Sequence, residues 1–588
     1  MDKFETSWFG QLLQTNQDFS KLTQNPVAYF CAEFALSDRL PIYSGGLGVL
    51  AGDMIKEAND MGIPFIGIGL LYKKGFYKQN ITDQNTQIED PQPVNARTAG
   101  LSLVLNNEGN VFMESIPVQG RSLHFQVWHL KIGTVDMYFL DTDVELNNES
   151  DRKITETLYG GDQQTRILQE IILGIGGEKT LYAQGIYPSI YHMNEGHSAF
   201  AAFGIIHHCM KLMKVGFQEA FESTRKKLVF TNHTLVPAGN DVFPKQTVVD
   251  MLTGYANEVG IPAEELISKG LTEDGNTFSM TIFAFNMSIK VNAVSALHAI
   301  KAKELWPSYN MESITNGVHV HTWTHPSLYR KLEAIMLERE IGIEHTLQYL
   351  SPAQIWELHQ DIKKEALRTL LTMTGSIFDK DVLTITWARR IAAYKRPDLI
   401  FSDIERLKRI LNSIQKPVQL IIAGKPHPKD DDARNILKHI LDSIDGMNEP
   451  NKVVYIPNYS ISTAQLLVAG SDLWLNNPIR GYEACGTSGM KASLNGILQF
   501  TVRDGWTDEV DWYGAGWVLD DTNTAESLYS QLENDITGTY YSRRENIPEV
   551  WVEMMMKTMD IAIKRYSSRR MLTDYFTKMY TPILNGSV

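Results

Sequence analysis

Cysteine is scarce in this sequence. Only three cysteines occur among 588 residues, Cys31, Cys209 and Cys485, and they lie far apart. An odd number of widely spaced thiols fits a reducing compartment better than a disulfide framework. We therefore expect a cytoplasmic protein.

Long apolar stretches and an excess of positive charge are also missing. No run of apolar residues is long enough to span a membrane, and the first residues, MDKFETSWFG, do not place a basic segment before an apolar one. We expect neither export nor membrane insertion. The formal net charge of -14 argues against a general nucleic-acid binder. Any anionic ligand therefore needs cations that are gathered locally.

The length and the hydrophobic pattern indicate two α/β domains. Short apolar runs alternate with helical patterns from residue 27 to residue 234, and a second such series begins at residue 381. Residues 351–375 begin with Ser-Pro and end in Gly, which predicts one long helix. We expect two Rossmann-like domains, residues 1–318 and 319–588, that face each other across a cleft, with the last helix packing back on the first domain.

One lysine stands in a glycine-rich segment, GYEACGTSGMKASLNG, at residues 481–496. Small residues before Lys491 allow a backbone to approach a phosphate closely, and a desolvated lysine can form a Schiff base. Pyridoxal phosphate requires both features. The alternative is a plain turn with a solvated lysine. A Walker phosphate loop is excluded because no Gly-Lys pair has the required spacing.

A cluster of cations follows a predicted strand in the second series. The segment RRIAAYKRP places Arg389, Arg390, Lys395 and Arg396 close together. Such a run is either a solvated surface or a phosphate site at the carboxyl end of a strand, where α/β sheets bind ligands.

Two further patterns have competing interpretations. Gly46-x-Gly48-x-x-Ala51 fits a loose dinucleotide fingerprint, but the next predicted strand lacks an acidic residue for a ribose. His319, His321 and His325 would direct imidazoles to one face of a strand, as zinc ligands do. No acidic partner stands nearby, and we expect no metal.

Seven segments in the same order along the chain carry a resemblance to a known family. They are residues 32–53, 192–200, 230–234, 314–319, 389–399, 423–428 and 483–496. Together they resemble the α-glucan phosphorylases, which act on glycogen, starch and maltodextrin, and are most similar to the short bacterial and archaeal branch. The resemblance implies a GT-B glycosyltransferase fold. It also implies an enzyme that splits terminal α-1,4 glucosidic bonds with inorganic phosphate and retains configuration, giving glucose 1-phosphate.

The resemblance also implies roles for particular residues. The residues implied in catalysis are Lys491, Arg390, Lys395 and His233. The residues implied to hold pyridoxal phosphate are Lys491, Gly486, Thr487, Ser488 and Arg389. The residues implied to bind glucan or substrate phosphate are Gly45, Gly46, Leu47, Glu33, Asn316 and Glu483. Two positions depart from the family, because Ser460 replaces a phosphate-binding arginine and Ala392 replaces a histidine. Arg480 is a candidate substitute for that arginine.

Two other functions fit a chain of this kind. A nucleotide-sugar α-glucan synthase of GT-B fold would need no pyridoxal phosphate. A noncatalytic glucan-binding homologue is suggested by the arginine missing at Ser460. Homodimers are common in the family, although no residue pattern in this chain points to one.

Overall fold

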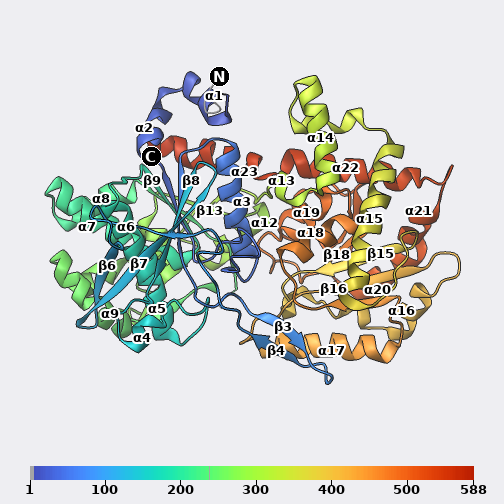
Figure 1. Cartoon of the computed structure of the whole chain (residues 1–588), viewed down its shortest axis with the longest axis horizontal. Coiled ribbons are helices and arrows are strands. Elements are labelled where there is room, and N and C mark those ends of the chain that lie inside the picture. Colours follow the sequence, from blue (N-terminus) through green and yellow to red (C-terminus); the bar gives the residue numbers. More distant parts are fainter. Residues whose placement is uncertain (1–5, 237–238, 588) are drawn as a thin grey trace. The chain divides into compact units, whose positions relative to one another are not determined.

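The computed structural model describes residues 6–236 and 239–587. The chain divides into two compact units, each made of α-helices and a largely parallel sheet (Figure 1). Unit 1 comprises residues 1–76, 91–314 and 571–588, and unit 2 comprises residues 77–90 and 315–570. None of the helices in the described part of the chain combines the length and apolar character that a membrane-spanning helix needs.

The sheet of unit 1 is parallel over most of its width. Its hydrogen-bonded order is β14 (Glu312–Ser313), β13 (Lys290–Ala293), β10 (Leu228–Thr231), β9 (Ile190–Asn194), β1 (Val27–Phe30), β2 (Phe65–Leu70) and β8 (Val135–Asp141), followed by the antiparallel β7 (Arg121–Ile132), which pairs with β5 (Ser102–Leu103) and β6 (Met113–Val118). Counted along the chain, the parallel strands follow the order 3-2-1-4-5-6-7. The direction of winding therefore reverses between β1 and β9, where Val27 is paired with Ile190.

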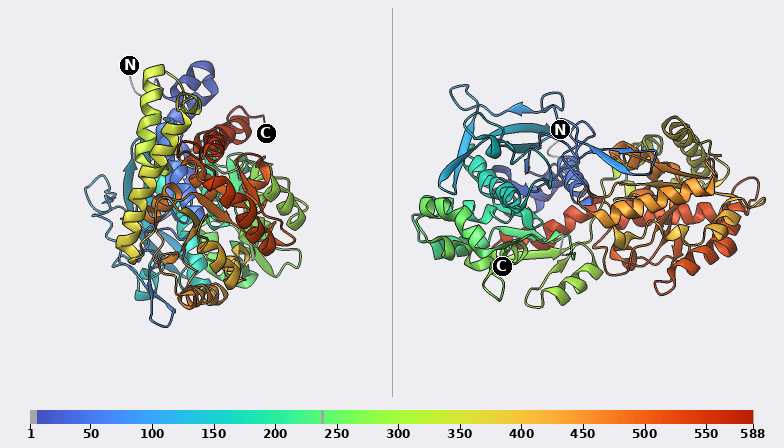
Figure 2. Two further views of the ribbon diagram at one scale, coloured as in Figure 1. Left: turned by 90° about the vertical axis from the view of Figure 1, so that its right-hand side faces the viewer. Right: turned by 90° about the horizontal axis from the view of Figure 1, so that it is seen from below.

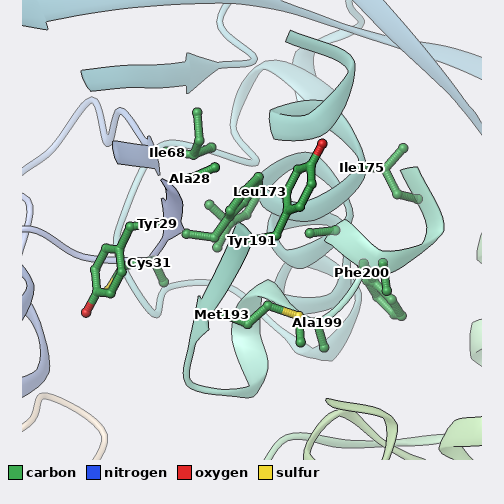
Figure 3. Close-up of a cluster of buried hydrophobic side chains, with 14 of the residues drawn as sticks. Ala28, Tyr29, Cys31, Ile68, Leu173, Ile175, Tyr191, Met193, Ala199 and Phe200 are labelled. Carbon is green, nitrogen blue, oxygen red and sulfur yellow. The ribbon is translucent and has the colours of Figure 1, made fainter. Parts of the chain in front are cut away.

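The core of unit 1 lies on both faces of this sheet. All residues of β1, β2 and β9 are buried, which is the burial pattern of strands covered by helices on both sides. Figure 3 shows Tyr29, Ile68 and Met193 from these strands with Leu173 and Phe200 from the covering segments. The strands that the short apolar runs predicted here are therefore confirmed.

Unit 2 contains a six-stranded parallel sheet. Its order is β17 (Val453–Ile456), β16 (Val418–Ala423), β15 (Leu383–Ala388), β18 (Leu473–Asn476), β19 (Leu498–Thr501) and β20 (Gly516–Val518). Counted along the chain this is 3-2-1-4-5-6, the doubly wound order of Rossmann folds. The winding reverses between β15 and β18, so ligands are expected beyond the carboxyl ends of these two strands.

The long helix predicted at residues 351–375 is confirmed as α15 (Pro352–Thr374). Ser351 and Gln354 form a capping box at its start, and Gly375 ends it with a φ of 76°. The glycine pattern at residue 46 begins α3 (Gly46–Asp60). The dinucleotide fingerprint requires a strand that leads directly into the helix. Here β1 ends at Phe30, so this requirement is not met.

The end of the chain belongs to unit 1. After α22 (Glu549–Arg565), the chain forms α23 (Ser568–Tyr575), and residues from Met571 onward pack in unit 1. There, the Tyr580 hydroxyl lies 2.7 Å from His192 Nδ1 at the centre of the unit 1 sheet. Burial away from solvent lowers the pKa of His192 to about 3, so this contact joins a neutral imidazole and a neutral hydroxyl group.

Candidate active site

Lys491 lies in a short helix that follows the winding reversal of the unit 2 sheet. After β18, the chain runs through residues 477–487 into α19 (Ser488–Leu494). The Lys491 side chain is buried, with Nζ 4.0 Å from the centre of the Trp323 ring. Asn495 joins the two residues, because its side-chain amide donates to the carbonyl oxygens of both Lys491 and Trp323. The solvated-lysine alternative is therefore wrong.

The two glycines around Thr487 have separate physical reasons. Gly486 has a φ of 79°, a conformation that residues with a Cβ rarely adopt, and a Cβ there would lie 3.0 Å from Glu483 Cγ. Gly489 lies against the next strand, where a Cβ would come within 2.5 Å of Gln499 Oε1. The first glycine therefore shapes the loop, and the second allows the helix to pack on the sheet.

The cations after β15 meet this loop. The Arg389 guanidinium donates to Glu483 Oε2 at 3.2 Å and to Ser488 Oγ at 3.0 Å. Lys395 Nζ donates to the same Glu483 oxygen at 2.7 Å. Arg389 and Lys395 are both buried, whereas Arg390 is exposed. The structure thus brings Arg389, Lys395, Glu483 and Ser488 together at the winding reversal.

This cluster changes the protonation equilibria of its members. Burial lowers the pKa of Lys395 to about 8, and the charges of Arg389 and Arg390 add to that effect. Burial acts on Glu483 in the opposite direction, but Lys395 and Arg389 outweigh it and hold the pKa of Glu483 below its ordinary value. Glu483 is therefore a carboxylate between two cations.

Asn316 approaches the same loop from a distant part of the sequence. The Asn316 backbone forms a hydrogen bond with Cys485, and its carbonyl oxygen accepts one from Arg570 at 2.9 Å. The side-chain oxygen Oδ1 is buried and has no hydrogen-bond partner among the described residues. Since a buried amide oxygen without a partner is unfavourable, this atom is a candidate acceptor for a ligand hydroxyl.

The donor set of unit 2 fits pyridoxal phosphate. The buried lysine lies in α19, and the loop before this helix is made of glycine and hydroxyl residues. The Arg389 guanidinium reaches Ser488 at the start of the helix. Thr487, at the N-cap of α19, uses no side-chain hydrogen bond to cap the helix. Lysine can hold the cofactor aldehyde, while hydroxyl groups, amides and arginine are the usual partners of a phosphate.

Ser460, at the position where the resemblance implies an arginine, caps a helix in this chain. Its hydroxyl accepts from Thr463 N at 3.3 Å and caps α18 (Ile461–Gly470). The suggested substitute, Arg480, is half-exposed and pairs with Asp508 at 3.0 Å and Asp521 at 3.6 Å. These carboxylates are partners of Arg480 outside the Glu483 cluster.

The zinc interpretation assumed that the histidine pattern lies on a strand, but the structure places these histidines at helix starts and within a helix. His319 caps α13 (Val320–Trp323), and His321 lies within that helix, where its ring stacks on Tyr329 at 4.5 Å. Across residues 6–236 and 239–587, no group of three or more potential metal ligands is found.

In unit 1, Glu33 lies beyond the carboxyl end of β1. Its Oε2 accepts from the backbone amides of Ser44 at 2.6 Å and Gly45 at 3.2 Å, and its Oε1 accepts from the Tyr159 hydroxyl at 2.9 Å. Gly46 and Leu47 follow at the start of α3, and a Cβ on Gly46 would meet nothing within 4 Å. Glu33 thus organises the glycine loop that was predicted to face phosphate.

His233 lies beyond β10, which is separated from β1 by β9 in the sheet. Its Nε2 bonds Asn194 Oδ1, while the Asn194 amide group points to Cys31 Sγ at 3.1 Å. Burial lowers the pKa of His233 to about 3, so the ring is neutral. Because Asn194 Oδ1 can only accept a hydrogen bond, the ring proton lies on Nε2, and Nδ1 can act as an acceptor. The ring can therefore accept a further hydrogen bond through Nδ1.

Sequence reasoning gave no role to Glu195, which fixes the His233 backbone. Its Oε2 accepts from His233 N at 2.8 Å. Glu195 has φ 71° and ψ 165°, a region that only glycine visits readily, and burial raises its pKa to about 8. Its position directly after β9, at the winding reversal, was the available signal.

Tyr159 is a second residue without a predicted role. It binds Glu33 although it has a φ of 54°, and Arg166 lies over its ring at 4.4 Å. Arg166 in turn pairs with Asp241 at 2.8 Å. A strained tyrosine on a buried carboxylate is a candidate for a functional role.

Comparison with known proteins finds relatives that match most of the chain. A family model described as carbohydrate phosphorylase matches residues 168–559. The maltodextrin phosphorylase of Thermococcus litoralis is 37% identical, over 99% of this chain and 73% of that protein. The glycogen phosphorylase of Mycobacterium tuberculosis is 34% identical, over 95% of this chain and 71% of that protein. The glycogen phosphorylase of Aquifex aeolicus is 33% identical, over 99% of this chain and 90% of that protein.

Proposed function

Since the chain belongs to the carbohydrate phosphorylase family and is an α-glucan phosphorylase, we propose that it transfers the terminal α-1,4-linked glucose of glycogen or maltodextrin to inorganic phosphate. The products are glucose 1-phosphate, with its configuration retained, and a glucan one unit shorter. The observation that supports this most is the buried Lys491 amine beside a loop that Arg389 and Lys395 also reach.

Unit 2 supplies the groups for the two phosphates. Lys491 would hold pyridoxal phosphate, with Arg389, Thr487 and the Gly486–Ser488 loop at its phosphate. When bound, this cofactor supplies a phosphate group that can exchange a proton with the substrate phosphate. Lys395 and the exposed Arg390 bring positive charge to the substrate phosphate, whose repulsion from a second phosphate must be offset by fixed cations.

Polar groups on both units would hold the sugar. Glu483 accepts hydrogen bonds and is fixed by two cations, and Asn316 Oδ1 is a buried acceptor. In unit 1, His233 Nδ1 can accept a sugar hydroxyl because Asn194 takes the Nε2 proton. Glu33 fixes the glycine loop through Ser44 and Gly45. Neutral hydroxylated rings are selected by such buried polar partners.

The arrangement of the two units as a GT-B pair facing across a cleft is part of this proposal. Both sheets reverse their winding between the first and fourth parallel strands, and both carry their candidate residues beyond the carboxyl ends of those strands. The three free cysteines support a cytoplasmic location. A homodimer is proposed from the family resemblance alone.

Replacement of Lys491 tests the proposal. Lys491→Ala should abolish phosphate-dependent release of glucose 1-phosphate from maltoheptaose, because the cofactor has no attachment point. After borohydride treatment, the mass of the intact wild-type protein should increase by that of the cofactor, less one water lost on imine formation and plus two hydrogens added by reduction, and the variant should show no increase. Lys438→Ala, which removes an exposed lysine paired with Asp442, is the matched control. Activity that survives in Lys491→Ala would contradict the assignment.

A further inference from the structure

A hairpin from the first part of the sequence packs within unit 2. Its strands β3 (Lys78–Ile81) and β4 (Gln87–Asp90) pair antiparallel. Along the sequence, residues 77–90 come between two segments of unit 1. Figures 1 and 2 show this hairpin beside α17 (Asp431–Met447). At its tip, the Asn85 amide donates to Asp442 at 3.0 Å and Asp445 at 2.8 Å.

The base of the hairpin holds two buried glutamines. Gln79 is 2% exposed and Gln87 is 4% exposed, although glutamine is usually a surface residue. Gln79 Nε2 donates to Gln87 Oε1 at 2.7 Å. Gln79 Oε1 lies 2.8 Å from Asn458 N and 2.9 Å from the Tyr455 hydroxyl, and Gln79 N donates to Asn458 Oδ1 at 3.2 Å. Each of these polar groups is thus satisfied inside unit 2.

These contacts reach the loops that follow β16 and β17. Asn458 lies two residues beyond β17 with a φ of 57°. Tyr455, the last but one residue of β17, shares its one hydroxyl proton between Gln79 Oε1 and Gly424 O beyond β16. Lys425 Nζ donates to Tyr77 O at 3.0 Å, and the Tyr77 hydroxyl donates to Pro426 O. The hairpin therefore ties two adjacent strand-end loops together.

The tied loops support the backbone of the cations. Arg389 N donates to Ala423 O at 3.2 Å, and Ile391 N donates to Lys425 O at 3.1 Å. The approach at Gly424 is so close that a Cβ there would lie 2.1 Å from Arg389 O. A displacement of residues 424–426 would thus displace Arg389 and the segment leading to Lys395.

From these contacts we infer that Gln79 and Tyr77 are positioning residues for the phosphate site of unit 2. They act through Gly424, Lys425 and Asn458 and set the places of Arg389 and Lys395. This inference rests on the proposed function, because it assigns phosphate to those cations. Loss of the Gln79 amide should weaken phosphate binding more than glucan binding. Displacements of about 1 Å can cost as much as 100-fold in rate, and we expect about a tenfold effect for one lost positioning group.

The test compares two leucine variants of the same hairpin. Gln79→Leu should raise the KM for inorganic phosphate about tenfold and leave the KM for maltoheptaose within about twofold. Gln84→Leu makes the same chemical change at an exposed tip residue and should change neither. Gln79→Glu keeps the oxygen acceptors of Gln79 but loses the donor to Gln87, and should give an intermediate KM for phosphate. If Gln79→Leu fails to fold, Gln79→Glu provides the test in its place.

Equal changes in both KM values, or a lowered melting temperature with both KM values unchanged, would overturn the inference, because a merely structural role predicts those results. Equilibrium binding of radiolabelled inorganic phosphate separates this inference from the proposed function. A wild-type protein without phosphorolysis would contradict the function, whereas the inference would still require weaker phosphate binding by Gln79→Leu than by Gln84→Leu.

Discussion

The winding reversals of the two sheets have the same strand order but opposite chemistry. In unit 1, the carboxylate of Glu33 lies beyond β1, and the acid of Glu195 lies beyond β9. In unit 2, Arg389 and Lys395 lie beyond β15, and Lys491 follows the loop beyond β18. One topology thus carries either acidic side chains with loop amides or a group of cations, depending on the few residues after four strands.

The two sites also share a device. In unit 1, Glu33 binds the amides of the glycine loop, and in unit 2 Glu483 binds Arg389 and Lys395. In both cases an internal carboxylate engages donors of a kind that can bind anions. Such a partner keeps the donors oriented and offsets their mutual repulsion. The comparison predicts that removing charge harms unit 2 more than unit 1.

Among variants that keep Lys491, the largest effect is expected from Lys395→Met in unit 2. This change removes a buried cation and leaves Glu483 with Arg389 as its remaining hydrogen-bonded cation. We expect kcat/KM for phosphate to fall by about 10² to 10³, the usual result of deleting one charge-stabilising donor. Initial rates at varied phosphate concentration measure it. Lys408→Met on the surface of α16 (Ile404–Leu411) is the control, and an equal loss in that variant would refute the comparison.

A smaller effect is expected from pH, again in unit 2. The pKa of Lys395 is lowered to about 8, chiefly by burial. A lysine with a depressed pKa loses its charge as pH rises through that value, so the KM for phosphate should rise above pH 8, by at most about tenfold per pH unit. Lys395→Arg should abolish this rise, because arginine remains protonated. A KM profile that is the same in both proteins would show that Lys395 does not titrate there.

The smallest effect concerns stability in unit 1. Glu195→Ala and Glu195→Gly both remove the carboxylate that accepts from His233 N, so both should lose activity. The glycine variant should be more stable by about 1–3 kcal/mol, because φ 71° and ψ 165° strain any residue with a Cβ. Thermal unfolding of the two variants measures the difference. Equal midpoints would mean that the strain has no energetic weight.

Local patterns predicted much of the fold and part of the site. Ser351 and Gly375 marked the ends of α15 because capping depends on a few adjacent residues. The position of the cations of residues 389–395 after a predicted strand left a solvated surface and a phosphate site as alternatives, and the structure buries Arg389 and Lys395 against Glu483. Arrangements that depend on neighbouring residues or on strand ends are thus accessible from sequence.

The remainder depends on contacts between distant residues. Nothing in residues 77–90 indicates that Gln79 bonds Asn458. The backbone conformation of Glu195 is imposed by its surroundings and contradicts the preference of glutamate. The role of Tyr159 rests on a contact with Glu33, far away in the chain. Such features arise from tertiary packing, which a single sequence does not display.

The interleaving of the two units along the chain has a consequence for biosynthesis. The chain passes from one unit to the other after residues 76, 90, 314 and 570. On the ribosome, the unit 1 sheet emerges long before Tyr580, whose hydroxyl reaches His192 within it. Domains generally fold as they are synthesised, from the N-terminus onward. Here the first unit can be completed only after the whole of the second has been synthesised, and a premature stop between residues 315 and 570 truncates both units at once.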